Sequence, residues 1–381
     1  MNFRSYEIKD ICKIKSGKRL PKGTDFSEKP TKHKYIRARD IKNGKIDGSD
    51  LGYISEETQK NIERYIVNTN DIIITIAGTI GEVALVSKKF DGVNLTENAV
   101  RLTEFSKDVC PEFLAYILKS PERKEYMEQV AGGSAQPKLG IYKIEAIKVD
   151  LPDIQIQHKI ADVLSTYDNL IENNQKQIKL LEEAAQRLYK EWFVDLRFPG
   201  HENTKIVDGV PEGWRRGLLK ELISVNYGKE HKKAPDDGNI PVYGSGGLMR
   251  KCNKSLFSGE AVLIPRKGSL NNIMYVDETF WTVDTMFYAT MKQPHTAVFV
   301  YFFVKAFDMY SMNIGAAVPS MTTKILDAMD VVIPDKETLE KFDKLTKTYF
   351  NKIKTLQGQN ERLKIARNLL LPKLMSGEVE V

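Results

Sequence analysis

Histidine, cysteine and acidic side chains are the residues that most often carry catalysis or bind metals, and in this chain they form no recognisable motif. The five histidines have no closely spaced His, Cys or acidic partner of the zinc type. There is no GxxxxGK[ST] loop for nucleotide phosphates and no GxGxxG motif that opens a βαβ unit. We therefore predict a protein without catalytic residues or a metal site of its own.

Basic and amide side chains are the remaining candidates for chemistry, and they suit contacts with duplex DNA. Arg and Lys bind phosphates and guanine edges, whereas Asn and Gln can pair bidentately with adenine. Residues 1–45 hold 14 Lys/Arg against 5 Asp/Glu, and residues 215–267 hold 11 against 5. Each basic stretch opens one half of the chain and includes tyrosines. The pattern favours two phosphate-binding surfaces, with a merely solvated face as the alternative.

The candidate DNA-binding residues form one set in each half, and each set includes a glycine-containing turn and a later loop. In the first half the candidates are Lys15, Lys18, Arg19, Lys22, Lys34, Arg37, Arg39, Thr79, Ser134, Gln136 and Lys138. In the second half they are Lys229, Tyr243, Ser245, Arg250, Lys251, Arg266, Lys267, Ser269, Asn271, Asn272 and Ser320.

An internal repeat organises the elements that must position these residues. Residues 137–188 align without gaps on residues 319–370, and VDLPD at 149–153 falls on VVIPD at 331–335. Upstream the match is looser, as expected where a shared scaffold carries different binding surfaces. DIIITIAGTIGEVALV at 71–86 resembles EAVLIPRKGSLNNIMYV at 260–276, and both predict a strand, a turn and a strand. Residues 112–130 and 297–313 are predicted helices.

A heptad pattern follows each globular part and predicts two long helices. The first apolar seam consists of Ile160, Leu164, Tyr167, Ile171, Asn174, Ile178, Leu181, Ala185, Leu188 and Trp192. The second consists of Phe342, Thr346, Tyr349, Ile353, Leu356, Asn360, Leu363, Arg367, Leu370 and Leu374. Two equal seams in one chain most economically pack on each other.

Antiparallel pairing of the seams gives facing residues whose numbers share one sum. Matching Trp192 with Phe342 sets that sum at 534, and every seam residue then faces a seam residue. Asn174 and Asn360, the two asparagines of the seams, would face each other in this register. A buried amide without a partner costs about 1–3 kcal/mol, so the pair is a hypothesis for what fixes the register. The arrangement also places Arg367 opposite Tyr167, where its guanidinium could lie over the ring.

The predicted fold is therefore α/β (α+β), with two similar globular domains joined by two long antiparallel coiled-coil helices. We expect a first globular domain at 1–152, a central helix at 153–198, a second globular domain at 199–334 and a C-terminal helix at 335–381. The longest apolar run, residues 72–77, is too short to cross a bilayer, and no secretory signal opens the chain. The three cysteines are far apart in the sequence. Together, these features predict a cytoplasmic protein with reduced thiols.

Residues 156–200 and the following DGVPEGW at 208–214 resemble the central conserved region of Type I restriction-modification specificity subunits. The second copy, ending LLLPKLMSGEVEV, is similar to the C-terminal conserved region of that family, so the resemblance covers essentially the whole chain. The family's usual glutamate-glutamine pair after the Leu-Pro strand is Gln157-His158 here and Leu339-Glu340 in the second copy. Contacts of that pair are not carried over.

The resemblance implies two target-recognition domains that each bind half of a split site in double-stranded DNA. It further implies helices that space these domains and dock two methyltransferase subunits. S-adenosylmethionine would then belong to the methyltransferase subunits, and ATP and Mg to restriction and translocation subunits, with no cofactor in this chain. Two alternatives remain open at this point. One is the specificity subunit of a related system with a bipartite site, and the other is a coiled-coil adaptor that binds no DNA.

Overall fold

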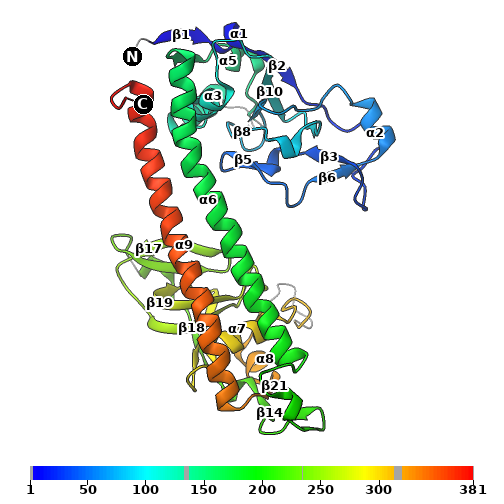
Figure 1. The fold of residues 1–381 in the computed structure, drawn as a ribbon, viewed down its shortest axis with the longest axis vertical. Coiled ribbons are helices and arrows are strands. Elements are labelled where there is room, and N and C mark those ends of the chain that lie inside the picture. The colour runs from blue at the N-terminus through cyan, green and yellow to red at the C-terminus, as the bar shows by residue number, and fades with distance from the viewer. Residues whose placement is uncertain (1–2, 133–136, 234, 313–319, 381) are drawn as a thin grey trace. The chain divides into compact units, whose positions relative to one another are not determined.

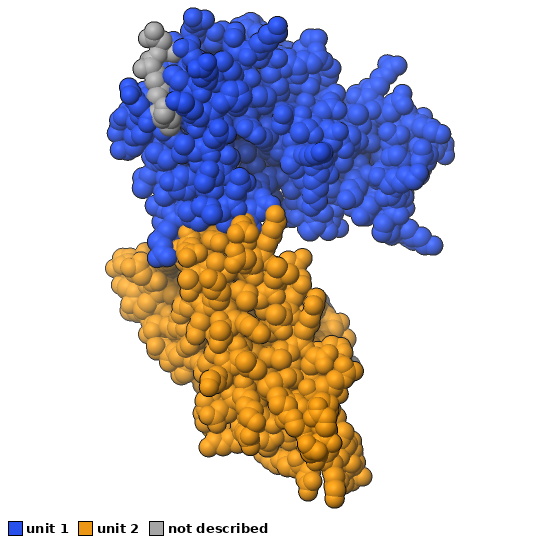
Figure 2. Space-filling model, in the orientation of Figure 1, with its two compact units in different colours: residues 1–172, 361–381 blue, residues 173–360 orange. Residues whose placement is uncertain are grey.

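The chain folds into two compact units, which Figures 1 and 2 show in a computed structural model. The structure describes residues 3–132, 137–233, 235–312 and 320–380. Unit 1 comprises residues 1–172 and 361–381, and unit 2 comprises residues 173–360. Each unit therefore contains one globular part and a portion of both long helices.

An antiparallel four-stranded sheet in the order β2-β10-β7-β8 forms the centre of unit 1. Smaller sheets in the orders β6-β3-β9, β1-β11 and β4-β5 surround it. The strands are β1 (Arg4–Glu7), β2 (Lys13–Ser16), β3 (His33–Ile36), β4 (Ile41–Lys42), β5 (Lys45–Ile46), β6 (Gly52–Ile54), β7 (Ile72–Thr75), β8 (Val83–Leu85), β9 (Asn94–Leu95), β10 (Ala99–Thr103) and β11 (Lys148–Leu151). The short helices are α1 (Ile8–Ile11), α2 (Glu56–Asn61), α3 (Pro111–Leu118), α4 (Pro121–Ala131) and α5 (Ile141–Glu145).

Unit 2 has a six-stranded sheet in the order β15-β20-β18-β19-β16-β17, together with the pairs β14-β21 and β12-β13. Its strands are β12 (Ile206–Val207), β13 (Val210–Pro211), β14 (Arg215–Leu218), β15 (Ile223–Tyr227), β16 (Ile240–Gly244), β17 (Gly247–Cys252), β18 (Phe257–Pro265), β19 (Met274–Thr282), β20 (Met286–Met291) and β21 (Asp330–Ile333). The short helices are α7 (Ala297–Lys305) and α8 (Thr323–Asp327).

The two globular parts share the pairing of four strands of the main sheet and of an outer pair of strands. The order β2-β10-β7-β8 corresponds to β15-β20-β18-β19, and the outer pair β1-β11 corresponds to β14-β21. Each part also has one parallel contact, with Tyr35 of β3 opposite Asn94 and Val242 of β16 opposite Trp281. The predicted fold class and the internal repeat are confirmed, and the turns at 76–82 and 266–273 connect the predicted pairs of strands.

The two predicted helices of the globular parts are shorter than the sequence pattern indicated. The stretch 112–130 is divided into α3 and α4, because Ser120 caps a new helix and Pro121 occupies its first turn. The stretch that begins at Ala297 ends as a helix at Lys305. All four residues of β7 are buried. The core of each globular part lies between its main sheet and these helices.

The long helices are α6 (Ile154–Tyr189) and α9 (Lys336–Ser376), drawn in green and in orange to red in Figure 1. Within unit 1, Ile160 and Leu164 of α6 share a core with Leu374 and the half-buried Leu370 of α9. Within unit 2, the rings of Trp192 and Phe342 lie 5.8 Å apart. The pairing in both units is antiparallel. Among the described residues, none of the helices is long and apolar enough to span a membrane.

The asparagine pair of the seams lies inside unit 2. The side-chain Nδ2 of Asn174 donates to Oδ1 of Asn360 at 2.9 Å, and both residues are buried. Facing residues here share the sum that the heptad pattern predicts. Arg367 does not lie over the ring of Tyr167 as predicted. Its guanidinium instead forms an ion pair with Asp168, because a carboxylate one residue along satisfies the charge better than a ring.

Candidate nucleic-acid interface

The turn after β2 is bound closely to the segment that leads into β10. The backbone N–H of Gly17 donates to the carbonyl of Ala99 at 3.1 Å, and that of Lys18 donates to Leu95 at 2.8 Å. A Cβ atom on Gly17 would lie 2.0 Å from the carbonyl oxygen of Thr96. No other residue type fits at this position, because a contact that short requires the backbone to move.

The turn after β7 joins the same place in unit 1. Ile76 N–H donates to the carbonyl of Asn98 at 2.8 Å, and Leu139 N–H donates back to Ile76 at 2.8 Å. Lys138 forms an isolated β-bridge with Ala77. Four segments that are distant in sequence therefore meet, and we call them the junction of unit 1: residues 17–19, 76–79, 95–98 and 138–139.

Unit 2 repeats this arrangement bond for bond. The N–H groups donate from Gly228 to Met286 (3.0 Å), from Lys229 to Thr282 (2.9 Å), from Arg266 to Thr285 (2.8 Å) and from Met321 to Arg266 (2.9 Å). Lys267 and Ser320 form the corresponding bridge, and a Cβ on Gly228 would lie 2.0 Å from the carbonyl oxygen of Val283. The junction of unit 2 consists of residues 228–230, 266–269, 282–285 and 320–321.

The side chains at equivalent junction positions differ between the units, although the backbone bonds are the same. In unit 1 the variable positions hold Arg19, Thr79, Glu97 and Lys138, and in unit 2 they hold Glu230, Ser269, Asp284 and Ser320. One backbone scaffold thus presents two different sets of hydrogen-bonding groups. The predicted DNA-binding residues that lie in the two junctions are Lys18, Arg19, Thr79 and Lys138 in unit 1, and Lys229, Arg266, Lys267, Ser269 and Ser320 in unit 2.

A pocket of about 380 Å³ adjoins the junction of unit 1 and contains three of the predicted arginines. Arg19, Arg37 and Arg39 line it together with Leu20, Phe26, Tyr35, Ala38, Thr96, Glu97 and Asn98. Each arginine is paired with a carboxylate. Nε of Arg19 is 2.7 Å from Glu97, Nε of Arg37 is 2.9 Å from Asp40, and Nη2 of Arg39 is 3.2 Å from Asp50. Three guanidinium groups are therefore matched by three carboxylates.

The carboxyl group of Glu97 is charged in this setting. Partial burial raises its pKa, but the hydrogen bonds from Arg19 and from the hydroxyl of Thr96 lower it further than burial raises it. The net result is a pKa below the ordinary value for glutamate. Glu97 is thus a fixed anion that orients Arg19.

The remaining candidates of unit 1 lie outside this pocket. Lys15 on β2 forms an ion pair with Glu104, and Nζ of Lys18 lies 5.6 Å from the centre of the Tyr65 ring. Lys22 is exposed in the loop before β3, and Lys34 is half-buried on β3. Ser134 and Gln136 lie outside the described residues.

Arg266 is the best-supported candidate of unit 2. Its guanidinium lies 5.7 Å from the centre of the Tyr227 ring, and its Nη1 donates to the carbonyl of Asp284 at 3.2 Å. Tyr227 is 55 % exposed, which is unusual for a large aromatic residue and leaves the ring accessible beside the cation. Lys267 and Ser269 are exposed on the same turn.

Several candidates of unit 2 use their polar groups for bonds to other residues of the same unit. The amide of Asn271 donates to Asp308 at 2.9 Å, and that of Asn272 donates to the carbonyl of Ser245 at 2.8 Å. The hydroxyl of Tyr243 donates to Glu278 at 2.5 Å. Arg250 pairs with Asp236 across a loop, and Lys251 is exposed on β17. The amides of Asn271 and Asn272 therefore hold the turn in shape, which the sequence pattern did not indicate.

Gln157, for which the sequence pattern indicated no contact, is a positioning residue. It is fully buried in the first turns of α6, where its Oε1 accepts from Cys110 N–H at 2.9 Å. Its Nε2 donates to the carbonyls of Asp108 and Pro152, both at 2.8 Å. The amide thus attaches α6 to the loop before α3. Its counterpart in unit 2, Leu339, is an apolar core residue.

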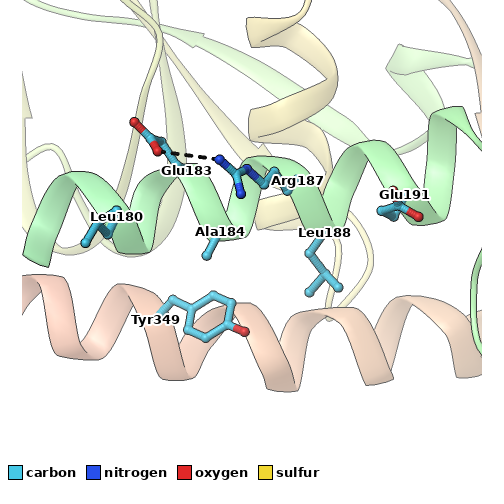
Figure 3. Close-up of a pocket in the computed structure, with 7 residues that line it drawn as sticks. All are labelled: Leu180, Glu183, Ala184, Arg187, Leu188, Glu191 and Tyr349. Carbon is cyan, nitrogen blue, oxygen red and sulfur yellow. Dashed lines mark ion pairs between the residues drawn. The ribbon is translucent and has the colours of Figure 1, made fainter.

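The helices of unit 2 also form a shallow groove of about 350 Å³. Figure 3 shows Ala184 and Leu188 of α6 pointing toward α9, with Tyr349 between the two helices and Leu180 at one end. Glu183 and Arg187 of α6 form an ion pair at the edge of the groove. Leu180 is 63 % exposed. This face therefore combines apolar side chains with charges at its rim, the composition of a protein-binding surface.

The two units are thus copies of one scaffold that carry different sets of polar side chains. The model of the type I restriction modification DNA specificity domain matches the chain over residues 2–183 and again over residues 211–364. The chain belongs to this family.

Named relatives support the same assignment. The chain is 27 % identical over 370 residues to the specificity subunit of the type I restriction enzyme MjaIX from Methanocaldococcus jannaschii, an alignment that covers 86 % of this chain and 82 % of the relative. It is 22 % identical over 479 residues to the HindI specificity subunit from Haemophilus influenzae, covering 99 % of this chain and all of the relative. The crystal structure of a type I S subunit from M. genitalium shares the fold, with a TM-score of 0.64 at 19 % identity, covering 98 % of this chain and 96 % of that one.

Proposed function

We propose that this chain supplies the DNA specificity of a type I restriction-modification enzyme, and that each globular part binds one half of a split target. The observation that carries the proposal is the junction that recurs in both units with different side chains. Two copies of one backbone scaffold can recognise unequal half-sites only if they carry different base-contacting side chains. Arg19 beside Glu97 in unit 1 and Arg266 beside Tyr227 in unit 2 are such contrasting sets.

The chain acts in this proposal as a non-catalytic cytoplasmic subunit whose partners perform the chemistry. Two modification subunits would methylate adenine with S-adenosylmethionine, and restriction subunits would use ATP and Mg for translocation and cleavage. The apolar groove on the helices of unit 2 supports docking of a modification subunit, because Leu180 leaves apolar surface uncovered there. Recognition remains the task of the two junctions.

The test is the salt dependence of DNA binding by the chain co-expressed with its modification subunits. Retention on duplex DNA that contains the target should fall steeply with salt. The double charge reversal Arg266→Glu with Lys267→Glu should weaken binding and lower the log–log slope by about 0.9 for each phosphate that the variant no longer binds.

A matched control is available on a different sheet of unit 2. Arg215 and Arg216 of β14 are also adjacent, exposed and basic, and Arg215 is held by Glu221 at 2.7 Å. Reversing both should leave the slope at the wild-type value. A complex that assembles normally but shows no salt-dependent retention of DNA would make the chain an adaptor rather than a DNA reader.

A further inference from the structure

Arg19 differs from the other arginines of its pocket in how its guanidinium is held. Its side chain is 81 % exposed, yet its Nε is fixed by Glu97 at 2.7 Å, across 78 residues of sequence. Among the residues that the structure describes, neither terminal amino group of Arg19 forms a hydrogen bond. The group is therefore oriented from one side and leaves a pair of parallel donors for a ligand.

A pair of donors in one plane has a restricted set of suitable acceptors. The O6 and N7 atoms of guanine and the oxygens of a phosphate both accept a bidentate arginine. The local charge separates these ligands. Because each arginine of the pocket is already paired with a carboxylate, a phosphate at Arg19 would have to lie beside the negative charge of Glu97. A guanine edge is uncharged and meets no such repulsion.

The Arg19–Glu97 ion pair contributes little to the stability of the fold. An exposed arginine-carboxylate pair contributes about 0–1 kcal/mol to stability, since solvent screens it and ordering the side chain costs entropy. Arg19 also directly follows Gly17 and Lys18, whose backbone is fixed by the junction. Arg19 is therefore preorganised for binding, because its backbone is held by the junction, its Nε is bonded to Glu97 and its terminal amino groups can donate to a ligand.

We propose that Arg19, oriented by Glu97 at the junction of unit 1, binds the O6 and N7 edge of a guanine in the half-site that unit 1 recognises. This inference rests on the proposed DNA-binding function and names one base contact within it. The equivalent position of unit 2 is Glu230, a hydrogen-bond acceptor. The second half-site therefore does not use an arginine at this position, and the same scaffold selects a different base there.

The experiment maps methylated adenines genome-wide in a host that lacks other adenine methylation and expresses the chain with its modification subunits. The wild-type complex should methylate a split motif with a guanine in one half-site. Arg19→Gln should relax that single guanine position, lowering its discrimination by roughly 10- to 100-fold, while the other half-site and the spacer stay unchanged. Glu97→Gln, which keeps Arg19 but removes the fixed anion, should relax the same position to a smaller degree.

Controls separate the possible causes of an effect. Arg215→Gln removes another exposed arginine that has a carboxylate partner and should leave the motif intact. Salt titration of DNA binding by the Arg19→Gln complex should give the wild-type slope. An unchanged motif would overturn the guanine contact and show that Arg19 does not contribute to specificity. Uniform weakening across sequences, with a salt slope lower by about 0.9, would instead make Arg19 a phosphate ligand. Failure of the wild-type complex to bind DNA would overturn the proposed function itself. A melting temperature well below wild type in both Arg19→Gln and Glu97→Gln would show that the Arg19–Glu97 ion pair serves stability rather than recognition.

Discussion

Lys119 follows α3 in unit 1 and is surrounded by charged and aromatic groups. Its Nζ lies 5.5 Å from the centre of the Tyr116 ring. Burial is the main reason that the pKa of Lys119 is lowered to about 8. The carboxylate of Asp168 opposes this shift, whereas the cations of Lys45 and Arg367 add to it. The folded state thus holds this proton less tightly than the unfolded chain, where the pKa is near the ordinary 10.5.

This difference predicts how stability depends on pH. Below about pH 8, protonated Lys119 destabilises the fold. Between pH 8 and 10.5 the unfolded state binds more protons, so the Lys119 contribution to the free energy of unfolding should increase with pH. Lys119→Met should be more stable than wild type at pH 7, on the order of 1–2 kcal/mol after allowance for partial exposure.

Urea denaturation of both proteins at pH 7, 8, 9 and 10 measures the effect. The advantage of Lys119→Met should shrink as the pH increases. Lys179→Met, which removes an exposed lysine of α6, controls for the loss of one positive charge. A constant difference between Lys119→Met and wild type at every pH would contradict the assignment.

The long helices are amphipathic elements whose register depends on one polar layer. Asn174 and Asn360 bury their amides together in unit 2, where each is the other's hydrogen-bond partner. Apolar layers tolerate slipping between heptads, but a slipped register would separate the two amides and leave both unsatisfied. We propose that this pair selects one register of α6 against α9 at a cost in stability.

Asn174→Leu alone should reduce the free energy of unfolding by about 1–3 kcal/mol, because it leaves the amide of Asn360 buried without a partner. The double variant with Asn360→Leu should recover wild-type stability or exceed it, since neither polar group remains. A double-mutant cycle from thermal or urea unfolding measures this coupling. Methylation mapping of the double variant should show a wider range of tolerated spacer lengths. Additive losses in the cycle would show that the amides act independently.

In each globular part a strand near the start pairs with the last strand, before the long helix begins. In unit 1, β1 pairs with β11 from Arg4 opposite Leu151 to Glu7 opposite Lys148, and α6 starts at Ile154. A chain exchange at Pro152 therefore preserves all sheet pairing of the globular part. Ile160 and Leu164 of α6 still contribute to its core, so the incoming part must present an apolar face to them.

Replacing residues 1–152 with the equivalent part of another family member should change one half of the methylated motif and keep the other half. The reason is that each junction is assembled entirely from segments of its own unit. Methylation mapping of the chimera in complex with modification subunits decides the question. The reciprocal exchange of residues 199–334 is the control, and it should alter only the other half. A change in both half-sites from a single exchange would show that the two specificities are not separable.

The sequence alone determined the properties that depend on order along one chain. The gap-free repeat, the strand-turn-strand units and the heptad seams are periodic signals, and the register followed from them because antiparallel pairing gives facing residues a constant sum. The Asn174–Asn360 contact needed no further information. Lengths of short helices were less predictable, as the break at Pro121 shows, because local capping overrode the apolar pattern.

Only the tertiary structure decided which polar side chains act together. Arg19 and Glu97 are distant in sequence, and their pairing depends on how the turns after β2 and β7 meet the segment before β10. Asn271 and Asn272 are of a residue type that can read bases, yet their amides bond to Asp308 and Ser245 of the same unit. The physical reason is that polar contacts are short and directional. The conformation of the loops therefore decides whether a polar side chain is available to DNA or bonded within its own unit. The sequence of a loop has no periodic pattern from which that conformation could be predicted.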